Sequence, residues 1–393
     1  MSLLFELPPA GDPITLGDSV GESTAELFEG YSLVAYGSGT SALAAALRVA
    51  ADVCGITRPE VVLPAYGCPN LVSAARYAGV QPVLVDLEAQ RPWLDLSGVE
   101  QALNPRTVAV VAVDLFGIPE RTEKLHQLAR QAGAVLIQDS AQACPETATR
   151  QGAGDLVIVS FGKAKPVSLL GGGAVLTRRN DLASRLQVLS YRSGNWWRHV
   201  CYTVKASFYN GLAISPRFFG SLRRLPFLHI GETRYVPLSR IEPPDAVVFD
   251  HLARNIRSYR ARSTNVAVNL SEMLTRLHSW SLIDLPGVCG VPAALRLWRY
   301  PVLVRNSYLR QSLRDALLKA GVGVSTMYPA PLARLPGLHD INPSNQYPNA
   351  EAFARQILTL PTHSGVTAEI LETIEDVLGC FSGNTPETDL EAA

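Results

Sequence analysis

The chain lacks several features that would each assign it to a broad class of protein. Its 393 residues carry 35 basic and 35 acidic side chains. No net charge therefore attracts nucleic acid or an anionic membrane to the whole surface, and a general electrostatic binder is excluded. No apolar run reaches 18 residues, and the first 20 residues contain Glu6 and Asp12 without a basic stretch ahead of an apolar one. We predict no membrane-spanning helix, no signal peptide and a cytoplasmic protein.

Cysteine and histidine lack the spacings of metal sites. The six cysteines contain no C-x-x-C pair, and the seven histidines contain no H-E-x-x-H motif. In a chain of this length, dispersed cysteines indicate free thiols in a reducing compartment, and the absent ligand spacings predict no metal site. The 47% apolar content is enough for a sizeable core and excludes a disordered chain.

Between residues 33 and 177, short apolar segments alternate with longer amphipathic ones. Strands are predicted at 33–36, 61–63, 83–85, 108–113, 135–137, 156–160 and 174–177, and helices at 40–53, 70–77 and 121–132. This alternation is typical of crossover units on a mostly parallel, buried sheet, and it predicts an α/β fold.

Past Asn180 the alternation stops. Residues 191–231 contain six basic side chains, several aromatic ones and no acid. Two interpretations stay open. The segment is either a lid or surface for anionic head groups or a nucleotide diphosphate, which would include peripheral contact with a membrane, or an insert that packs through its aromatic rings.

A second unit is predicted in the C-terminal part, with a long helix at 245–274, strands at 299–304 and 323–326, and a helix at 309–320. We expect an irregular segment at 1–30, a large α/β domain at 31–250 with the insert at about 191–235, a small α+β domain at 251–381, and a polar tail at 382–393.

Lysine is scarce, and its placement indicates chemistry. The chain has five lysines against 30 arginines, and Lys163 and Lys165 lie in one hexapeptide. This hexapeptide, 160–165, follows an apolar strand, so it lies at a strand end, where α/β enzymes place ligand sites. A lysine there serves either carbonyl chemistry, as an amine, or phosphate pairing, as a cation.

An aspartate at the end of a predicted strand favours one of these two roles for the lysine. The strand at 135–137 leads into Asp139, and Gln142 follows three residues later. Alone, such an aspartate is more often a cap or a metal ligand. With a loop lysine further along the chain it suits pyridoxal phosphate (PLP), because a carboxylate within about 4 to 6 Å keeps the pyridine nitrogen protonated. Gln142 would then hydrogen-bond the phenolic oxygen of the ring.

The segment 37–41 supplies a phosphate site. It lies between a strand and a helix, so free backbone N–H groups and the positive end of the helix dipole would face an anion. It also matches the dinucleotide fingerprint as Gly37-x-Gly39-x-x-Ala42. A nicotinamide-binding site of this type, however, has an acidic residue at the end of the next strand, and this chain lacks one there. The nicotinamide interpretation also gives Asp139 no role.

Six segments in a fixed order carry a resemblance to a known family. They are Ser38-Gly39-Thr40-x-Ala42-Leu43, Val61-Val62-Leu63-Pro64, the run from Gly79 to Asp86, Asp139-Ser140-Ala141-Gln142-Ala143, Ser160-Phe161-x-x-x-Lys165 followed by Gly172-Gly173, and Leu360-Pro361-Thr362-His363. In order and spacing they resemble the DegT/StrS family of sugar aminotransferases.

The resemblance implies a fold-type I PLP enzyme, with a large domain built on a mostly parallel mixed sheet flanked by helices and a smaller C-terminal α+β domain. It implies a homodimer with active sites at the subunit interface, an amino acid donor and a nucleotide-linked keto-sugar acceptor. Such enzymes act in polysaccharide or cell-surface glycan biosynthesis and have no nucleic-acid partner.

The resemblance also implies roles for individual residues. Lys165 resembles the Schiff-base lysine and Asp139 the partner of the pyridinium nitrogen, while Lys163 does not fit the family spacing. Gln142 resembles the contact to the phenolic oxygen. The residues that resemble the phosphate ligands are Gly39, Thr40 and Ser160.

Two departures from the family bear on the site, and only the second concerns substrate identity rather than the cofactor. Cys68 stands where the family usually stacks an aromatic side chain on the cofactor ring. Near 235–239 the chain lacks the asparagine and arginine that the family commonly offers to the phosphate of the neighbouring subunit.

The sequence therefore predicts a PLP-dependent aminotransferase in which Lys165 holds the cofactor and moves a proton while Asp139 keeps the ring electron-poor. Three alternatives stay open. One is a non-catalytic homologue that binds PLP or a sugar nucleotide and acts by interaction. The others are a PLP-dependent sugar dehydratase, a branch with histidine at the lysine position, and a nicotinamide oxidoreductase.

Overall fold

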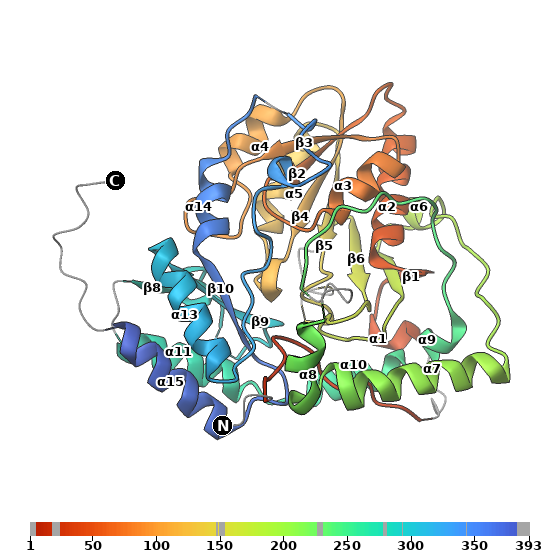
Figure 1. The fold of residues 1–393 in the computed structure, drawn as a ribbon. Coiled ribbons are helices and arrows are strands. Elements are labelled where there is room, and N and C mark those ends of the chain that lie inside the picture. Colours follow the sequence, from red (N-terminus) through yellow and green to blue (C-terminus); the bar gives the residue numbers. More distant parts are fainter. Residues whose placement is uncertain are drawn as a thin grey trace.

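The computed structural model describes residues 5–17, 24–146, 148, 154–225, 231–277, 281–292, 294–342 and 344–382 (Figure 1). Within these ranges, no helix combines the length and apolar content needed to cross a bilayer. The predicted polar tail, 382–393, lies outside the described residues except for its first position.

A seven-stranded sheet forms the centre of the larger part of the molecule. Its strands are β1 (Ser32–Tyr36), β2 (Glu60–Pro64), β3 (Gln81–Val85), β4 (Thr107–Val113), β5 (Val135–Asp139), β6 (Leu156–Ser160) and β7 (Gly173–Thr177). Their order across the sheet is β1-β7-β6-β5-β4-β2-β3. Only β7 runs against its neighbours, β1 and β6, and the other pairings are parallel. The predicted α/β fold is confirmed.

Helices cover both faces of this sheet, as parallel strands require. They are α2 (Gly39–Cys54), α3 (Asn70–Tyr77), α4 (Leu96–Ala102) and α5 (Thr122–Gln131). On β2, Val61 and Leu63 join the core cluster of α2 and α3, whereas Val62 joins the cluster of α4 and α5. Alternate side chains of one strand therefore pack on opposite layers.

A three-stranded antiparallel sheet organises the C-terminal part, in the order β10-β9-β8. Its strands are β8 (Leu282–Asp284), β9 (Arg299–Val304) and β10 (Ile357–Pro361), and its main helices are α11 (Asn265–Leu277), α13 (Ser307–Lys319) and α15 (Ala368–Ser382). The shorter elements of the chain are α1 (Thr24–Leu27), the 3-10 turns Leu115–Gly117 and Leu332–Arg334, α6 (Asn180–Ala183), α12 (Leu285–Val288) and α14 (Pro348–Gln356). The domain boundaries predicted at residues 30, 250 and 381 stay predictions.

The strand predicted at 323–326 is wrong. Only Ser325 bridges to the sheet, through backbone hydrogen bonds with Thr359 of 2.8 and 3.2 Å. The N-terminal segment lies over this stretch, where Leu7 N–H donates to the Gly321 carbonyl at 2.8 Å. A contact from a distant part of the chain therefore replaces the strand pairing that the local pattern favours.

The single helix predicted at 245–274 is also wrong, because the chain forms α9 (Ala246–Asp250), α10 (Leu252–Ala261) and α11 there. The larger break follows α10, where Arg262 adopts an extended backbone conformation. The Ser263 hydroxyl then accepts a hydrogen bond from Asn265 N–H at 3.1 Å, at the start of α11. Ser263 thus forms a local turn, and the Thr264 carbonyl accepts the first bond of the new helix from Val268 N–H at 3.1 Å.

The basic aromatic segment is mostly helical. It contains α7 (Trp196–Phe208), a π-helical turn (Tyr209–Ala213) and α8 (Pro216–Arg223), which follow one another along one edge of the molecule (Figure 1). Tyr202, Ala206 and Phe219 are buried, so the packing interpretation holds for one side of the segment.

Candidate active site

One pocket contains every residue singled out for cofactor binding or catalysis. It is lined by Gly39, Thr40, Leu43, Cys68, Asn70, Leu71, Val113, Asp139, Ala141, Gln142, Ile158, Ser160 and Lys165. These residues come from the carboxyl ends of β2, β4, β5 and β6 and from the start of α2. Because parallel strands bring those ends to one edge, the pocket lies where ligands of α/β sheets bind.

The start of α2 forms an anion cradle in this pocket. Ser38 caps the helix, with its hydroxyl oxygen accepting from Ser41 N–H at 3.1 Å. Gly39 and Thr40 begin α2, and the N–H groups in the first turn of a helix have no acceptor within the helix. A Cβ at Gly39 would lie 2.7 Å from the Ser160 Cβ, so only glycine allows this close approach. The free N–H groups, the helix dipole and the Ser160 hydroxyl suit a phosphate.

Asp139 is the acid of the pocket, at the end of β5. Its Oδ1 accepts a hydrogen bond from Ala141 N–H at 3.0 Å. Burial raises the pKa of its carboxyl group, the nearby Lys165 amine opposes that rise, and the neighbouring Asp114 carboxylate adds to it. A further positive charge in the pocket would therefore be stabilised, and a protonated pyridine ring fits this requirement.

Lys165 lies on the loop that follows β6, and Lys163 does not line the pocket. Lys163 is exposed, whereas Lys165 is partly buried with its Nζ 5.8 Å from the centre of the Trp298 ring. The Lys165 amine makes no hydrogen bond or ion pair with another described residue. It is therefore free to react with a carbonyl group.

Gln142 is held in one orientation by two partners. Its Oε1 accepts from Phe116 N–H at 2.8 Å, and its Nε2 donates to the Tyr328 hydroxyl at 2.9 Å. One N–H of the amide remains for a ligand, in agreement with a contact to a phenolic oxygen. Cys68 contributes a thiol near Lys165 and Tyr328, and burial raises its pKa, so the thiol stays protonated near neutral pH.

Tyr328 and Trp298 are the site residues that the sequence did not reveal. They come from the C-terminal part of the chain, which the motifs placed outside the pocket. Tyr328 stands before a proline in an irregular stretch, and Trp298 precedes a buried strand. Neither position has a spacing that distinguishes a site residue from a core aromatic.

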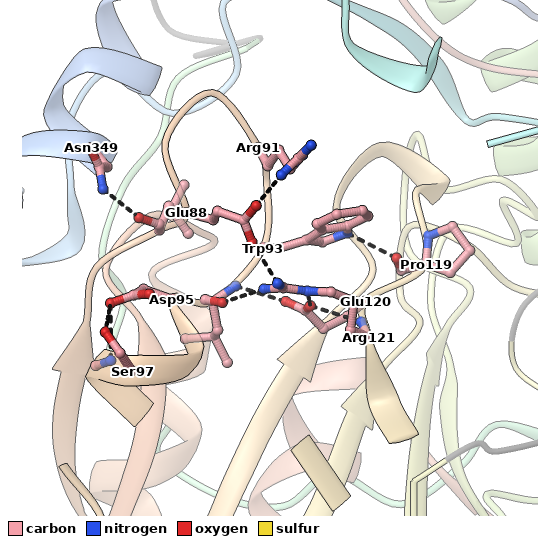
Figure 2. A network of polar contacts seen from close by, with 12 residues as sticks. Glu88, Arg91, Trp93, Asp95, Ser97, Pro119, Glu120, Arg121 and Asn349 are labelled. Carbon is pink, nitrogen blue, oxygen red and sulfur yellow. Dashed lines mark hydrogen bonds and ion pairs between the residues drawn. The ribbon is translucent and has the colours of Figure 1, made fainter. Parts of the chain in front are cut away.

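A polar network fixes the loop that positions Gln142 (Figure 2). The Arg121 guanidinium bonds to Glu88 at 2.5 Å and lies 4.8 Å from the Trp93 ring centre, and the Trp93 indole N–H donates to the Pro119 carbonyl at 3.0 Å. The Glu120 carboxylate accepts from Leu94 N–H at 2.8 Å. The loops after β3 and β4 are thereby held together.

The network continues towards the pocket through Asp114. Its buried carboxylate accepts from Glu120 N–H at 2.9 Å, from Gln138 Nε2 at 2.8 Å and from the Ser140 hydroxyl at 2.7 Å. Gln138 and Ser140 flank Asp139 on both sides. Asp114 therefore orients the strand end that carries the acid of the pocket.

Comparisons with known proteins give the family. The sequence profile of the DegT/DnrJ/EryC1/StrS aminotransferase family matches residues 18–210 and 246–379. The chain is 30% identical over 337 residues to a dTDP-3-amino-3,4,6-trideoxy-alpha-D-glucose transaminase from Streptomyces venezuelae, covering 84% of this chain and 77% of the relative. It is 28% identical over 349 residues to the erythromycin biosynthesis sensory transduction protein EryC1 of Saccharopolyspora erythraea, covering 87% and 83%.

Solved structures share the fold. PseC of Helicobacter pylori, an aminotransferase involved in the biosynthesis of pseudoaminic acid, superposes with a TM-score of 0.72 at 15% identity, over 96% of this chain and 99% of its own. NtdA of Bacillus subtilis, solved with bound cofactor PMP, gives 0.66 at 18% identity, over 89% and 73%.

These matches confirm the predicted family, the fold-type I architecture and the cofactor. The family profile leaves out residues 211–245, which include α8 and the segment that lacks the family's asparagine and arginine. The chain belongs to the DegT/DnrJ/EryC1/StrS aminotransferase family and is a PLP-dependent aminotransferase.

Proposed function

We propose that this aminotransferase moves an amino group from an amino acid donor to a nucleotide-linked keto-sugar, in the biosynthesis of a polysaccharide or cell-surface glycan. One observation carries the assignment of the site. Lys165 and Asp139, which follow different strands, line the same pocket, and the pKa of Asp139 responds to the Lys165 amine. The acceptor class is supported by the named activity of the Streptomyces venezuelae relative.

Each residue then has a definite task. Bound PLP supplies an aldehyde that condenses with amines and a ring that accepts an electron pair. The Lys165 amine would hold the cofactor, and as a base in the pocket it would move a proton to and from the substrate carbon. Asp139 keeps the ring nitrogen protonated, and the free N–H of Gln142 contacts the phenolic oxygen.

The phosphate would be held by backbone N–H groups of Gly39 and Thr40 and by the Ser160 hydroxyl. Cys68 would pack against a face of the ring with a smaller contact area than an aromatic side chain. We further propose a homodimer with both active sites at the subunit interface, as the sequence motifs of the family imply. Light scattering of the purified protein tests the dimer directly.

The decisive experiment compares two neighbouring lysines. Lys165→Ala should bind PLP without a covalent link, lose the absorption band of the lysine adduct and lose turnover by roughly 10⁴-fold, because the proton carrier is gone. The matched variant Lys163→Ala removes an exposed amine from the same loop and should keep both the band and the activity. A Lys165→Ala protein that still transaminates would contradict the assignment.

The substrates are tested by a two-stage screen. Amino acids are first tried one at a time for their ability to change the absorption of the bound cofactor. The donors that succeed are then combined with a panel of nucleotide-linked keto-sugars, and the aminated sugar is identified by mass spectrometry. A donor-dependent product supports the proposal. Spectral change with donors but no product from any nucleotide-linked sugar would contradict the acceptor class.

A further inference from the structure

The outer side of α7 carries an apolar stripe that faces solvent. Trp197, Val204 and Phe208 are seven and four residues apart, so they lie on one face of the helix. Their exposed fractions are 61%, 62% and 57%, and the adjacent Trp196 is 74% exposed. The opposite face holds the buried Tyr202 and Ala206. The helix is therefore apolar on two sides, and only one of them packs against the protein.

The stripe is large for a surface that meets water. The rings of Trp196 and Trp197 lie 5.9 Å apart and contact each other. Three large apolar side chains share one face of α7 with Trp196 beside them, and exposed apolar patches mark interaction sites in soluble proteins. α7 runs along an edge of the molecule (Figure 1).

Basic side chains accompany this stripe, and within the part of the chain that the structure describes some of them have an acidic partner while others do not. Residues 191–231 contain no acid. Within this segment, Arg198 pairs with Asp245 and Arg223 with Glu6. The exposed Lys205, Arg217 and Arg224 form no ion pair with another described residue. Phe218 on α8 and Leu225, which follows the end of that helix, are 47% and 40% exposed, so the same mixture of apolar and cationic groups continues past the π-helical turn.

We propose that the outer surface of α7 and α8 binds the headgroup region of a lipid bilayer that contains anionic lipids. Tryptophan and phenylalanine prefer the boundary between headgroups and acyl chains, and lysine and arginine beside them pair with lipid phosphates. A second copy of the chain fits less well, since two such surfaces would bring unpaired cations together.

Vesicle flotation of the full-length protein tests the proposal. Wild-type protein should float with vesicles of phosphatidylcholine and phosphatidylglycerol and much less with phosphatidylcholine alone. The variant Trp197→Ser/Phe208→Ser should lose flotation with both. The variant Lys205→Gln/Arg217→Gln/Arg224→Gln should bind the anionic vesicles about a hundredfold more weakly, at about fivefold for each of the three charges removed.

Tyr308, which is 84% exposed on α13, provides the matched control. Tyr308→Ser removes an exposed aromatic side chain elsewhere and should leave flotation unchanged. Circular dichroism establishes that each variant is folded. Wild-type protein that does not float with anionic vesicles would overturn the proposal. An equal loss of flotation in Tyr308→Ser would also overturn it. If wild-type protein does not bind vesicles and the molecular mass of the particle falls in Trp197→Ser/Phe208→Ser, the stripe joins copies of the chain instead.

Discussion

At the scale of single residues, Asp139 combines burial with two oppositely acting neighbours. The Lys165 amine lowers the pKa of its carboxyl group, and burial and Asp114 raise it. Asp139→Asn removes the charge that keeps the cofactor ring protonated and nearly preserves the shape of the side chain. We expect kcat to fall by about 10³-fold, since the carboxylate charge that stabilises the protonated cofactor ring is lost.

Asp181, an exposed aspartate paired with Arg179, is the control for this prediction. Asp181→Asn should leave kcat at the wild-type value. Steady-state kinetics with a donor found in the spectral screen provides the measurement. An Asp139→Asn enzyme with kcat within threefold of wild type would show that another group protonates the ring.

The sequence located the polar residues that line the pocket better than the aromatic residues that lie beside it. Lys165, Asp139 and Gln142 follow buried strands at positions where a charged or amide side chain has no role in folding, so their chemistry stands out. Tyr328 and Trp298 look like core aromatics in the sequence, and both are indeed largely buried. Their place beside the pocket depends on how the C-terminal part packs, which no local pattern encodes.

At the scale of elements, the first turn of α2 depends on the closeness of β6. A Cβ at Gly39 would come within 2.7 Å of the Ser160 Cβ. Gly39→Ala should therefore push the helix start away from Ser160 and weaken PLP binding by about tenfold or more, the loss of roughly one charge-assisted hydrogen bond. Fluorescence titration of the apoenzyme with PLP measures the change.

Gly379, on α15, has no atom within 4 Å of a built Cβ and provides the matched substitution. Gly379→Ala should leave the affinity for PLP unchanged. If Gly39→Ala binds PLP as tightly as wild type, the cradle at the start of α2 is not the phosphate site.

Helices and strands were predicted with the right bounds where the local sequence pattern agrees with how the segment packs in the folded protein. The helix at 70–77 and the strands at 156–160 and 299–304 have the predicted bounds. α4 was missed because only Val99 of its residues is buried and a glycine lies near its middle, so it shows no apolar period. The helix at 245–274 was drawn too long because the extended backbone at Arg262 and the turn formed by Ser263 end one helix and begin another.

At the scale of the whole molecule, the N-terminal segment ties distant parts together. The His363 imidazole donates from Nε2 to the Pro8 carbonyl at 2.8 Å, and its Nδ1 accepts from Gly365 N–H at 3.1 Å. Asp12 pairs with Arg262 at 2.9 Å. In the neutral imidazole of His363, both ring nitrogens are therefore hydrogen-bonded. A second proton, bound at Nδ1, would point at the Gly365 N–H and break that hydrogen bond.

This arrangement predicts a loss of stability in acid. Burial lowers the pKa of His363 below its ordinary value of 6.5. The unfolded chain then takes up a proton that the folded chain resists, so the contribution of His363 is complete above pH 6.5 and is lost as the pH falls towards the folded-state pKa. Between pH 7.5 and 5.5 this group should lower the free energy of unfolding by up to about 1 kcal/mol.

Urea denaturation at the two pH values measures the effect. His363→Gln keeps a donor for Pro8 but does not titrate, so the difference between the two pH values should shrink by that amount. The exposed His339→Gln should retain the wild-type difference. An unchanged pH dependence in His363→Gln would rule out this histidine as the source.

The pocket has a consequence for how the enzyme matures. Its lining comes from turns near residues 40, 68, 139 and 165, and its aromatic partners come from near 298 and 328. A nascent polypeptide that has emerged only as far as the lysine already possesses the groups for anchoring a vitamin derivative, but not the tyrosine that steadies Gln142. Because β1, which leads to Gly39, joins the sheet through β7 alone among the described strands, the vitamin's place cannot be assembled before the ribosome has passed well beyond the lysine codon.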